Sequence, residues 1–351
     1  MNNQISLYEF GHNFLGPICS EYFYALKQRC EDVKPDRLLF LAREGYLFSQ
    51  VYQTLVDKGL FQDIPHTYLY ASRTFLFRIC IGDPSTWSWS LSHGFYGSLQ
   101  KLLIGRFGFT LSQVNNIFSE SELSVKWYLP LEQKQLELFF MTVLDKLKHS
   151  VKNSRAAYMD YLGESGVSSV KTPLMLDVGY GGTIQKLLTG LLNVDTQGLY
   201  FIATKEGKHP VRDKVANMKS VYKQGVTMGD GYTMLDRSLF LESLLTAPQG
   251  QFVDISKKSE FSKQPFNFFF GRLANTQKSM HELQTVFDGA IEAICHAFEN
   301  NIRYSVTEIE DMYEKFAFNR RMFPRATWSL FDVDDAISGN SNVNPLHLFR
   351  L

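Results

Sequence analysis

The chain has 351 residues, of which 44% are apolar, so it is long enough for one large or two modest domains. Its 36 basic residues balance its 36 acidic residues, and a net charge of zero argues against a non-specific nucleic-acid binder. The four cysteines are widely spaced, which favours a reducing cytoplasm over a disulfide framework or a zinc finger. We expect neither an export signal nor a membrane span, because no segment has the required apolar run.

The first half of the chain has the pattern of helices alternating with short strands. Apolar residues three and four apart predict a helical segment over residues 5–29, with a kink at Gly16–Pro17. A buried strand is expected over Arg37–Arg43, followed by a tight turn and a helix. A second short strand is expected over Tyr68–Arg73, so both strands end in a turn that carries an arginine.

The next segments predict a helical insertion and then a βαβ unit. Residues 82–163 read as the insertion, and we assign no chemistry to residues 82–127. Residues 172–204 predict strand, glycine-rich turn, helix and strand. Residues 205–235 are polar and glycine-rich, which indicates loops with a strand or two, and a short helical pattern follows over 237–246.

These elements predict an α/β fold, with a Rossmann-like, mostly parallel sheet as its core, helical insertions and a helical C-terminal region. Residues 1–250 are expected to form the donor-binding core. Residues 251–351 are expected to form the mainly helical region, either separate or part of the same domain.

The turn after the strand Leu174–Asp177 is the strongest candidate for an anion site. Gly179, Gly181 and Gly182 would let backbone N–H groups approach an anion, and Thr183 is placed to cap the next helix or to donate its hydroxyl. The spacing lacks the third glycine of the dinucleotide fingerprint and the lysine of the Walker loop. A phosphate or sugar-phosphate site and a plain tight turn both remain open.

Charged groups at two other strand ends point to the same edge of the sheet. Arg43 and Glu44 follow the first strand, and Ser72 and Arg73 follow the second. Ligands of open α/β sheets bind beyond the carboxyl ends of the strands, and a guanidinium can bind phosphate through two parallel bonds. We expect Arg43, Arg73 and Asp177 to lie around one ligand, although ion pairs or surface turns would also explain each of them.

A carboxylate within an apolar helical stretch is the last candidate. Glu242 interrupts the run Leu239–Leu245, and a carboxylate among leucines needs a partner or a function. An exposed helix position is the alternative. The scattered histidines have no metal-binding spacing, and no G-x-S-x-G elbow is present, so neither a histidine metal site nor a serine hydrolase is supported.

Four segments occur in the order that is typical of one bacterial family: FLAREGYLFSQVY, YLYASR, LDVGYGGTIQKLL and LESLLTAPQG. Over residues 5–250 the chain resembles the glycan phosphoribosyltransferase, or ribofuranosyltransferase, domains of capsule and O-antigen assembly. In that family the domain is often joined to a phosphatase of the haloacid dehalogenase superfamily, and such chains are loosely labelled predicted hydrolases.

The resemblance implies transfer of a 5-phosphoribosyl group from phosphoribosyl pyrophosphate to a hydroxyl of a glycan or lipid-linked glycan. It also implies donor-bound Mg²⁺, a separate phosphatase and other glycosyltransferases as partners, and a cytoplasmic location that is free or peripheral at the inner membrane face. Glu44, Asp177 and Glu242 are the catalytic candidates. The donor-binding candidates are Arg43, Ser72, Arg73, Gly179, Gly181, Gly182, Thr183 and Gln185.

The chain departs from the family pattern in two places. No apolar strand ends in D-x-D-x-T, so the phosphatase half is absent, and the family's Arg-Asp-Gly appears as Arg43-Glu44-Gly45. Asp177 is followed by Val178, so the adjacent acidic pair of nucleotide phosphoribosyltransferases is also missing. A phosphate-ester hydrolase and a non-catalytic subunit of a polysaccharide assembly complex remain the alternatives.

Overall fold

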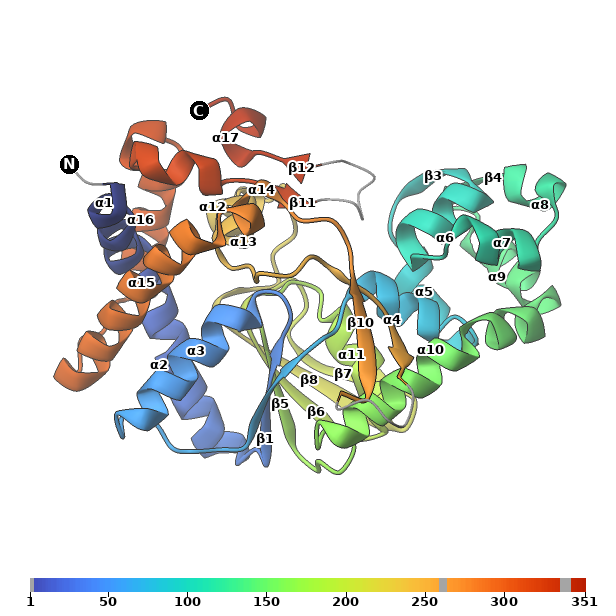
Figure 1. Cartoon of the computed structure of the whole chain (residues 1–351), viewed down its shortest axis with the longest axis horizontal. Helices are drawn as coiled ribbons and strands as arrows, with labels where there is room; N and C mark the ends of the chain where they lie inside the picture. The colour runs from blue at the N-terminus through green and yellow to red at the C-terminus, as the bar shows by residue number, and fades with distance from the viewer. Residues whose placement is uncertain (1–2, 259–263, 335–341) are drawn as a thin grey trace.

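The centre of the molecule is a six-stranded sheet (Figure 1). The computed structural model describes residues 3–258, 264–334 and 342–351. The strands are β1 (Arg37–Leu41), β2 (His66–Leu69), β5 (Pro173–Asp177), β6 (Thr196–Ala203), β7 (Gly207–Val211) and β8 (Lys214–Gln224). Their order is β2-β1-β5-β6-β8-β7, and all neighbours are parallel except β7, which is antiparallel to β8. This confirms the Rossmann-like α/β core.

Both faces of the sheet are buried, which explains the continuous apolar runs of its central strands. Successive side chains of a strand point to opposite faces. Leu38 and Phe40 of β1 therefore join one core, whereas Leu39 and Leu41 join the other. The two cores require a layer of helices on each side.

The first helical layer combines the two ends of the chain. Its elements are α1 (Asn3–Phe10), the π-helix η1 (Gly11–Leu15), α2 (Gly16–Val33), α3 (Gly45–Asp57), α15 (Met280–Asn300) and α16 (Val306–Ala317). A kink was expected at Gly16–Pro17, and a π-helix ends directly before these two residues, which begin α2. The N-terminal helices pack closely on α15, since a Cβ at Gly11 would lie 1.9 Å from the carbonyl oxygen of Val286.

The second layer comprises α4 (Arg73–Ile79), α10 (Leu144–Glu164) and α11 (Thr183–Leu192) with the hairpin of β9 (Phe252–Lys257) and β10 (Phe266–Phe270). The hairpin is an addition to the expected helical C-terminal region. Phe252, Ile255 and Phe266 are buried in the same core as α4 and α10.

The remaining short elements are α12 (Thr233–Asp236), α13 (Leu239–Leu244), α14 (Asn275–Lys278), η3 (Arg320–Met322), η4 (Arg325–Leu330), β11 (Val333–Asp334), β12 (Asn342–Val343) and α17 (Pro345–Leu348).

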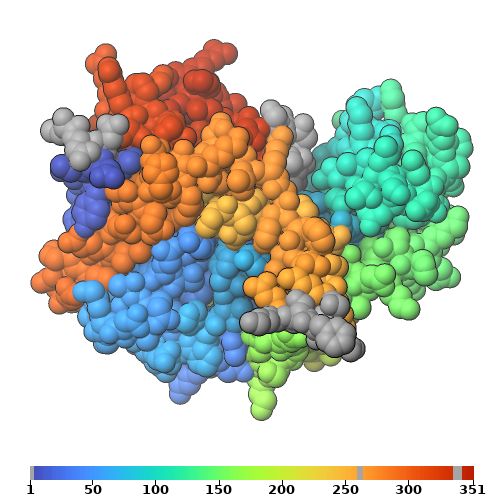
Figure 2. Space-filling view, viewed as in Figure 1, coloured from blue at the N-terminus to red at the C-terminus, as the bar shows by residue number. Residues whose placement is uncertain are grey.

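The insertion between β2 and β5 forms a lobe that protrudes beside the rest of the molecule (Figures 1 and 2). It contains η2 (Pro84–Thr86), α5 (Trp87–Leu91), β3 (Phe95–Ser98), α6 (Leu99–Phe107), α7 (Leu111–Ile117), α8 (Glu120–Ser124), β4 (Lys126–Leu129) and α9 (Gln133–Thr142). The lobe is mostly helical as expected, and β3 and β4 form a small antiparallel hairpin within it. Helix α10 then returns the chain to the sheet.

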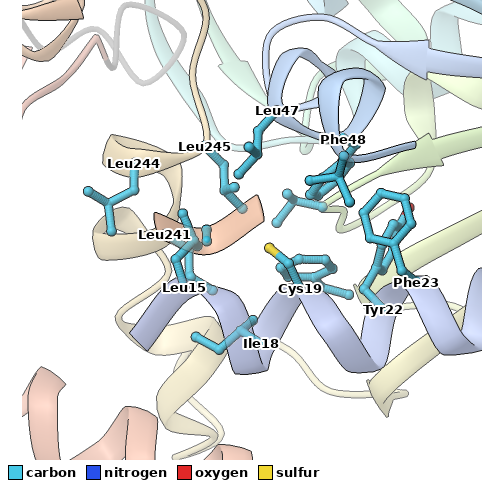
Figure 3. Packing of buried hydrophobic residues seen from close by; sticks show 14 of the residues in the cluster. Leu15, Ile18, Cys19, Tyr22, Phe23, Leu47, Phe48, Leu241, Leu244 and Leu245 are labelled. Atoms are coloured by element: carbon cyan, nitrogen blue, oxygen red, sulfur yellow. The ribbon is translucent and has the colours of Figure 1, made fainter. Parts of the chain in front are cut away.

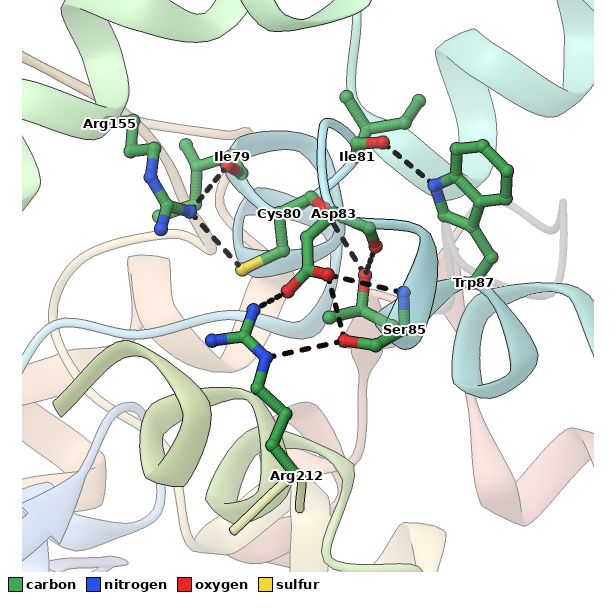
Figure 4. Close-up of polar contacts among 9 residues, drawn as sticks. Ile79, Cys80, Ile81, Asp83, Ser85, Trp87, Arg155 and Arg212 are labelled. Carbon is green, nitrogen blue, oxygen red and sulfur yellow. Dashed lines mark hydrogen bonds and ion pairs between the residues drawn. The ribbon is translucent and has the colours of Figure 1, made fainter. Parts of the chain in front are cut away.

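Polar contacts fix the base of this lobe (Figure 4). Arg212, in the turn between β7 and β8, forms an ion pair with Asp83. Arg155 of α10 donates to the carbonyl of Ile79 at 3.0 Å, and the indole of Trp87 donates to the carbonyl of Ile81 at 2.7 Å. The start of the lobe is therefore held against both α10 and the edge of the sheet.

Two expectations from composition can be compared with the structure. All four cysteines are buried and free. Within residues 3–258, 264–334 and 342–351, no helix combines the length and the apolar character needed to cross a bilayer.

Candidate functional site

β1 and β5 are adjacent parallel strands, and the order in which the chain adds strands reverses between them. From β1 the chain passes through α3 to β2 on one side, and from β5 it passes through α11 to β6 on the other. Ligands of open α/β sheets bind at such a switch point, beyond the carboxyl ends of the strands. The segments after β1 and β5 are therefore the first place to look for a site.

The turn after β1 presents Arg43 and Glu44, both half-buried. A carboxylate oxygen of Glu44 accepts a hydrogen bond from the backbone N–H of Arg43 at 2.9 Å. Helix α3 begins at the next residue, and a Cβ on Gly45 would lie 2.6 Å from the carbonyl carbon of Phe40. Glycine allows this close approach, so both charged side chains stay at the strand end.

The turn after β5 is fixed by backbone bonds and leaves the start of α11 without a side-chain cap. The N–H of Phe201 in β6 donates to the carbonyl of Val178 at 3.1 Å, and the N–H of Thr204, just after β6, donates to that of Tyr180 at 2.9 Å. The N-cap is Gly182, at φ +61°, so Thr183 is the first helical residue and not the cap. Amides of an uncapped first turn can bind an anion. The Ala42–Arg43 and Gly179–Tyr180 peptide bonds are both cis.

Glu242 reaches the same edge from the short helix α13. Its carboxylate accepts hydrogen bonds from the hydroxyl of Tyr180 at 2.9 Å and from that of Ser238 at 3.1 Å. Leucines on α13 and just after it pack into the core that α2 and α3 also line (Figure 3). This packing holds Glu242 next to the glycine-rich turn, so it is a partnered carboxylate and not a freely exposed one.

The three carboxylates lie close enough to affect one another. Asp177 interacts electrostatically with both Glu44 and Arg73. Glu242 interacts with both Glu44 and Arg43. We call Glu44, Asp177 and Glu242 the carboxylate cluster. The structure thus brings the carboxylate cluster together with two arginines, Arg73 acting on Asp177 and Arg43 acting on Glu242.

Burial gives two of these carboxyl groups raised pKa values. Burial and then the charge of Glu44 raise the pKa of Asp177 well above its usual value, against hydrogen bonds from the N–H groups of Val178 and Gly179. Burial and Glu44 also raise the pKa of Glu242, whereas bonds from Tyr180 and Ser238 lower it. Carboxyl groups that hold protons more strongly than usual are typical of acid–base sites.

We expect Asp177→Asn to stabilise the fold at alkaline pH. Because the folded-state pKa is raised, the neutral carboxyl is the stabilising form, and its contribution is lost as pH rises above the unfolded value of about 3.9. Asparagine stays neutral and keeps an acceptor oxygen. At pH 8 urea denaturation should show the variant about 1–2 kcal/mol more stable, with the difference shrinking toward pH 4. A gap that is constant with pH would show that the Asp177 carboxyl does not titrate as argued.

Two predicted donor-binding residues have other partners in the structure. Ser72 caps α4, since its hydroxyl accepts from the N–H of Phe75 and donates to the carbonyl of Phe252 at 2.6 Å. Gln185 is fully buried and bonds to Tyr200, to Thr196 and to a backbone carbonyl. We remove both from the donor-binding set, because these bonds occupy their polar atoms.

The sequence analysis missed two aromatic residues at this edge. Tyr180 lies inside the glycine-rich segment, and its hydroxyl orients Glu242. Tyr68 interacts with Glu44 and Arg43, and its hydroxyl accepts a bond from Gln249 at 2.7 Å. All three of Tyr68, Tyr180 and Gln249 lie within the four family-like segments, which was the available signal.

The site is identified by its charged side chains, because the two hollows described next lie elsewhere in the molecule. A hollow of 280 Å³ lies among η1, α2, α15 and α16, and a shallower one of 410 Å³ lies beside β8. Neither is lined by a member of the carboxylate cluster.

The described residues do not form a cage for a metal ion, since they contain no group of three or more His, Cys, Asp or Glu side chains placed to hold one. Carboxylates are suitable Mg²⁺ ligands, but Mg²⁺ is often carried by the phosphates of a substrate. The expected donor-bound Mg²⁺ is consistent with this arrangement and stays a prediction.

Comparison with models of known protein families finds no match for this chain, and a search of curated proteins finds none either. The function is therefore proposed from the geometry of the site together with the resemblance of the four sequence segments.

Proposed function

We propose that this protein is a glycosyltransferase that moves 5-phosphoribosyl from phosphoribosyl pyrophosphate to a glycan hydroxyl in capsule or O-antigen biosynthesis. The observation that carries the proposal is the carboxylate cluster together with two arginines that act on different members of it, Arg73 on Asp177 and Arg43 on Glu242. The donor has phosphate groups at two ends of one sugar, so it needs separated anion sites around the anomeric carbon. A site with this division of charge matches that requirement.

The residues have distinct roles in this reaction. The acceptor hydroxyl forms a bond to the anomeric carbon as the bond from that carbon to the pyrophosphate oxygen breaks. Glu44, the member of the cluster that interacts with both others, takes the hydroxyl proton, and the pyrophosphate leaves with the bonding electrons. Carboxylate charge also stabilises the oxocarbenium-like transition state. Mg²⁺ bound to the donor would neutralise part of the phosphate charge.

The proposed setting follows from the acceptor. A lipid-linked glycan would place the protein in the cytoplasm or at the inner face of the membrane, beside other glycosyltransferases and a separate phosphatase that removes the 5-phosphate. The first alternative is a phosphate-ester hydrolase. The second is a non-catalytic subunit, which would tolerate loss of Arg43 and Glu44.

Mass spectrometry of acceptor glycans tests the proposal. The purified chain, phosphoribosyl pyrophosphate and Mg²⁺ are incubated with capsule and O-antigen fragments, and we expect one acceptor to gain a phosphopentose with release of pyrophosphate. Glu44→Gln serves as the control for contaminating activity. Release of phosphate without any acceptor would replace this proposal with the hydrolase, and no reaction on the full panel would favour the subunit.

A further inference from the structure

Arg73 belongs to a group of three basic side chains that act on His93 and come from three different helices. Arg73 begins α4, Arg106 belongs to α6, and Lys186 lies in the first turns of α11. Helix α4 packs against both α6 and α11, so the three elements form one unit. We call Arg73, Arg106 and Lys186 the cationic arc. Only Arg73 was expected to bind an anion, and Arg106 comes from the insertion to which the sequence assigned no chemistry.

Contacts with the insertion hold two members of the arc in place. Arg106 donates from Nη1 to the carbonyl groups of Ser90 and His93 at 3.1 and 3.0 Å, and from Nη2 to that of Gly94 at 2.8 Å. These bonds fix the loop and, unlike those of Ser72 and Gln185, leave Nε–H and one N–H of Nη2 to bind an anion. The ammonium of Lys186 lies 5.7 Å from the centre of the Trp89 ring. Trp89 in turn packs on a small core at the β6–β8 side of the sheet. The insertion and the sheet therefore support the arc together.

The arc holds positive charges together without carboxylate partners of its own. In the described part of the chain none of its members forms an ion pair, although Arg73 interacts electrostatically with Asp177. Burial and then Arg73 lower the pKa of Arg106, and burial and then Lys205 lower that of Lys186. Burial, Arg73 and Arg106 likewise lower the pKa of His93. A bound anion would relieve this mutual repulsion.

We propose that the cationic arc is the binding site for a diphosphate group. Two guanidinium groups and one ammonium match the charge of a diphosphate better than that of a single phosphate ester. Arg43, just after the end of β1, is a single guanidinium and fits the 5-phosphate. The inference rests on the proposed function for its setting, where the diphosphate is either that of the donor or that of a lipid-linked acceptor.

Calorimetry with inorganic pyrophosphate tests the site without requiring any transfer. In the full chain, with Mg²⁺ held constant, Lys186→Met and Arg73→Met should each raise Kd about tenfold. Lys152→Met, an exposed lysine of α10, is the matched control and should leave Kd unchanged. Trp89 gives a second readout, since pyrophosphate should change the tryptophan fluorescence of the native chain and not that of Trp89→Phe.

Two competitors separate the sources of the diphosphate. Displacement of pyrophosphate by phosphoribosyl pyrophosphate assigns the arc to the donor, whereas displacement by farnesyl diphosphate alone assigns it to a lipid-linked acceptor. Unchanged affinity in both Lys186→Met and Arg73→Met, or equal weakening in Lys152→Met, would overturn the proposal. The chain could bind pyrophosphate through Lys186 and yet show no transfer activity. That result would contradict the proposed transferase function and would still support the diphosphate site.

Discussion

Glu44→Gln is expected to slow phosphoribosyl transfer by about a hundredfold or more while leaving donor affinity nearly unchanged. The structure distinguishes Glu44 from the other two carboxylates, which a sequence cannot do. Asp177 is buried and accepts a bond from the N–H of Val178, and Glu242 accepts bonds from two hydroxyl groups. The Glu44 carboxylate is half-buried and bonds to one backbone N–H. It is therefore the member most free to meet an acceptor hydroxyl.

The measurement is a comparison of kcat and donor affinity for Glu44→Gln and Glu242→Gln. Both substitutions keep the size of the side chain and remove its charge. Glu242→Gln should cost less, about tenfold, because its role is to shape the charge around Glu44 and not to accept the proton. The assignment fails if Glu242→Gln or Asp177→Asn is the slower variant, or if Glu44→Gln acts only by weakening donor binding.

The strand ends were accessible to sequence analysis because apolar runs and their first polar residues are local features. Arg43, Glu44 and Asp177 follow buried strands that the pattern predicts, and parallel strands carry their ends to one edge. The boundary of β2 was less accurate. The strand was predicted to extend to Arg73, but it ends at Leu69, and Ser72 caps a helix. The prediction was too long because a serine can follow a strand as well as cap a helix.

The residues that the sequence missed depend on contacts between distant segments. Tyr180 and Glu242 are 62 positions apart, and only the packing of α13 on α2 and α3 joins them. Gln185 was named as a donor-binding candidate from the family-like segment that contains it, yet its side chain is buried in the core. Arg106 gave no signal at all, since a lone arginine on a helix is usually solvated.

Gly181→Val is expected to weaken binding of phosphoribosyl pyrophosphate by about a hundredfold, through loss of the charge-assisted bonds that the turn amides would make. Gly181 differs from Gly179 and Gly182 in its backbone angle and in the space around it. A Cβ at Gly181 would lie 3.8 Å from the hydroxyl of Thr204, which is an ordinary contact, and the residue has no positive φ. The backbone therefore accepts a Cβ at this position, and the methyl groups of valine are expected to occupy the space through which an anion reaches the backbone.

Gly182→Ala provides the contrast that separates binding from stability. Gly182 has φ +61°, and its Cβ would lie 2.1 Å from the side chain of Met218, so alanine should lower the free energy of unfolding by at least about 1 kcal/mol. Gly181→Val should keep a melting temperature within about 2 °C of the native chain. Calorimetry with the donor then tests whether the turn contacts the donor. Native affinity in a folded Gly181→Val chain would show that the turn does not contact the donor and that the arginines bind it alone.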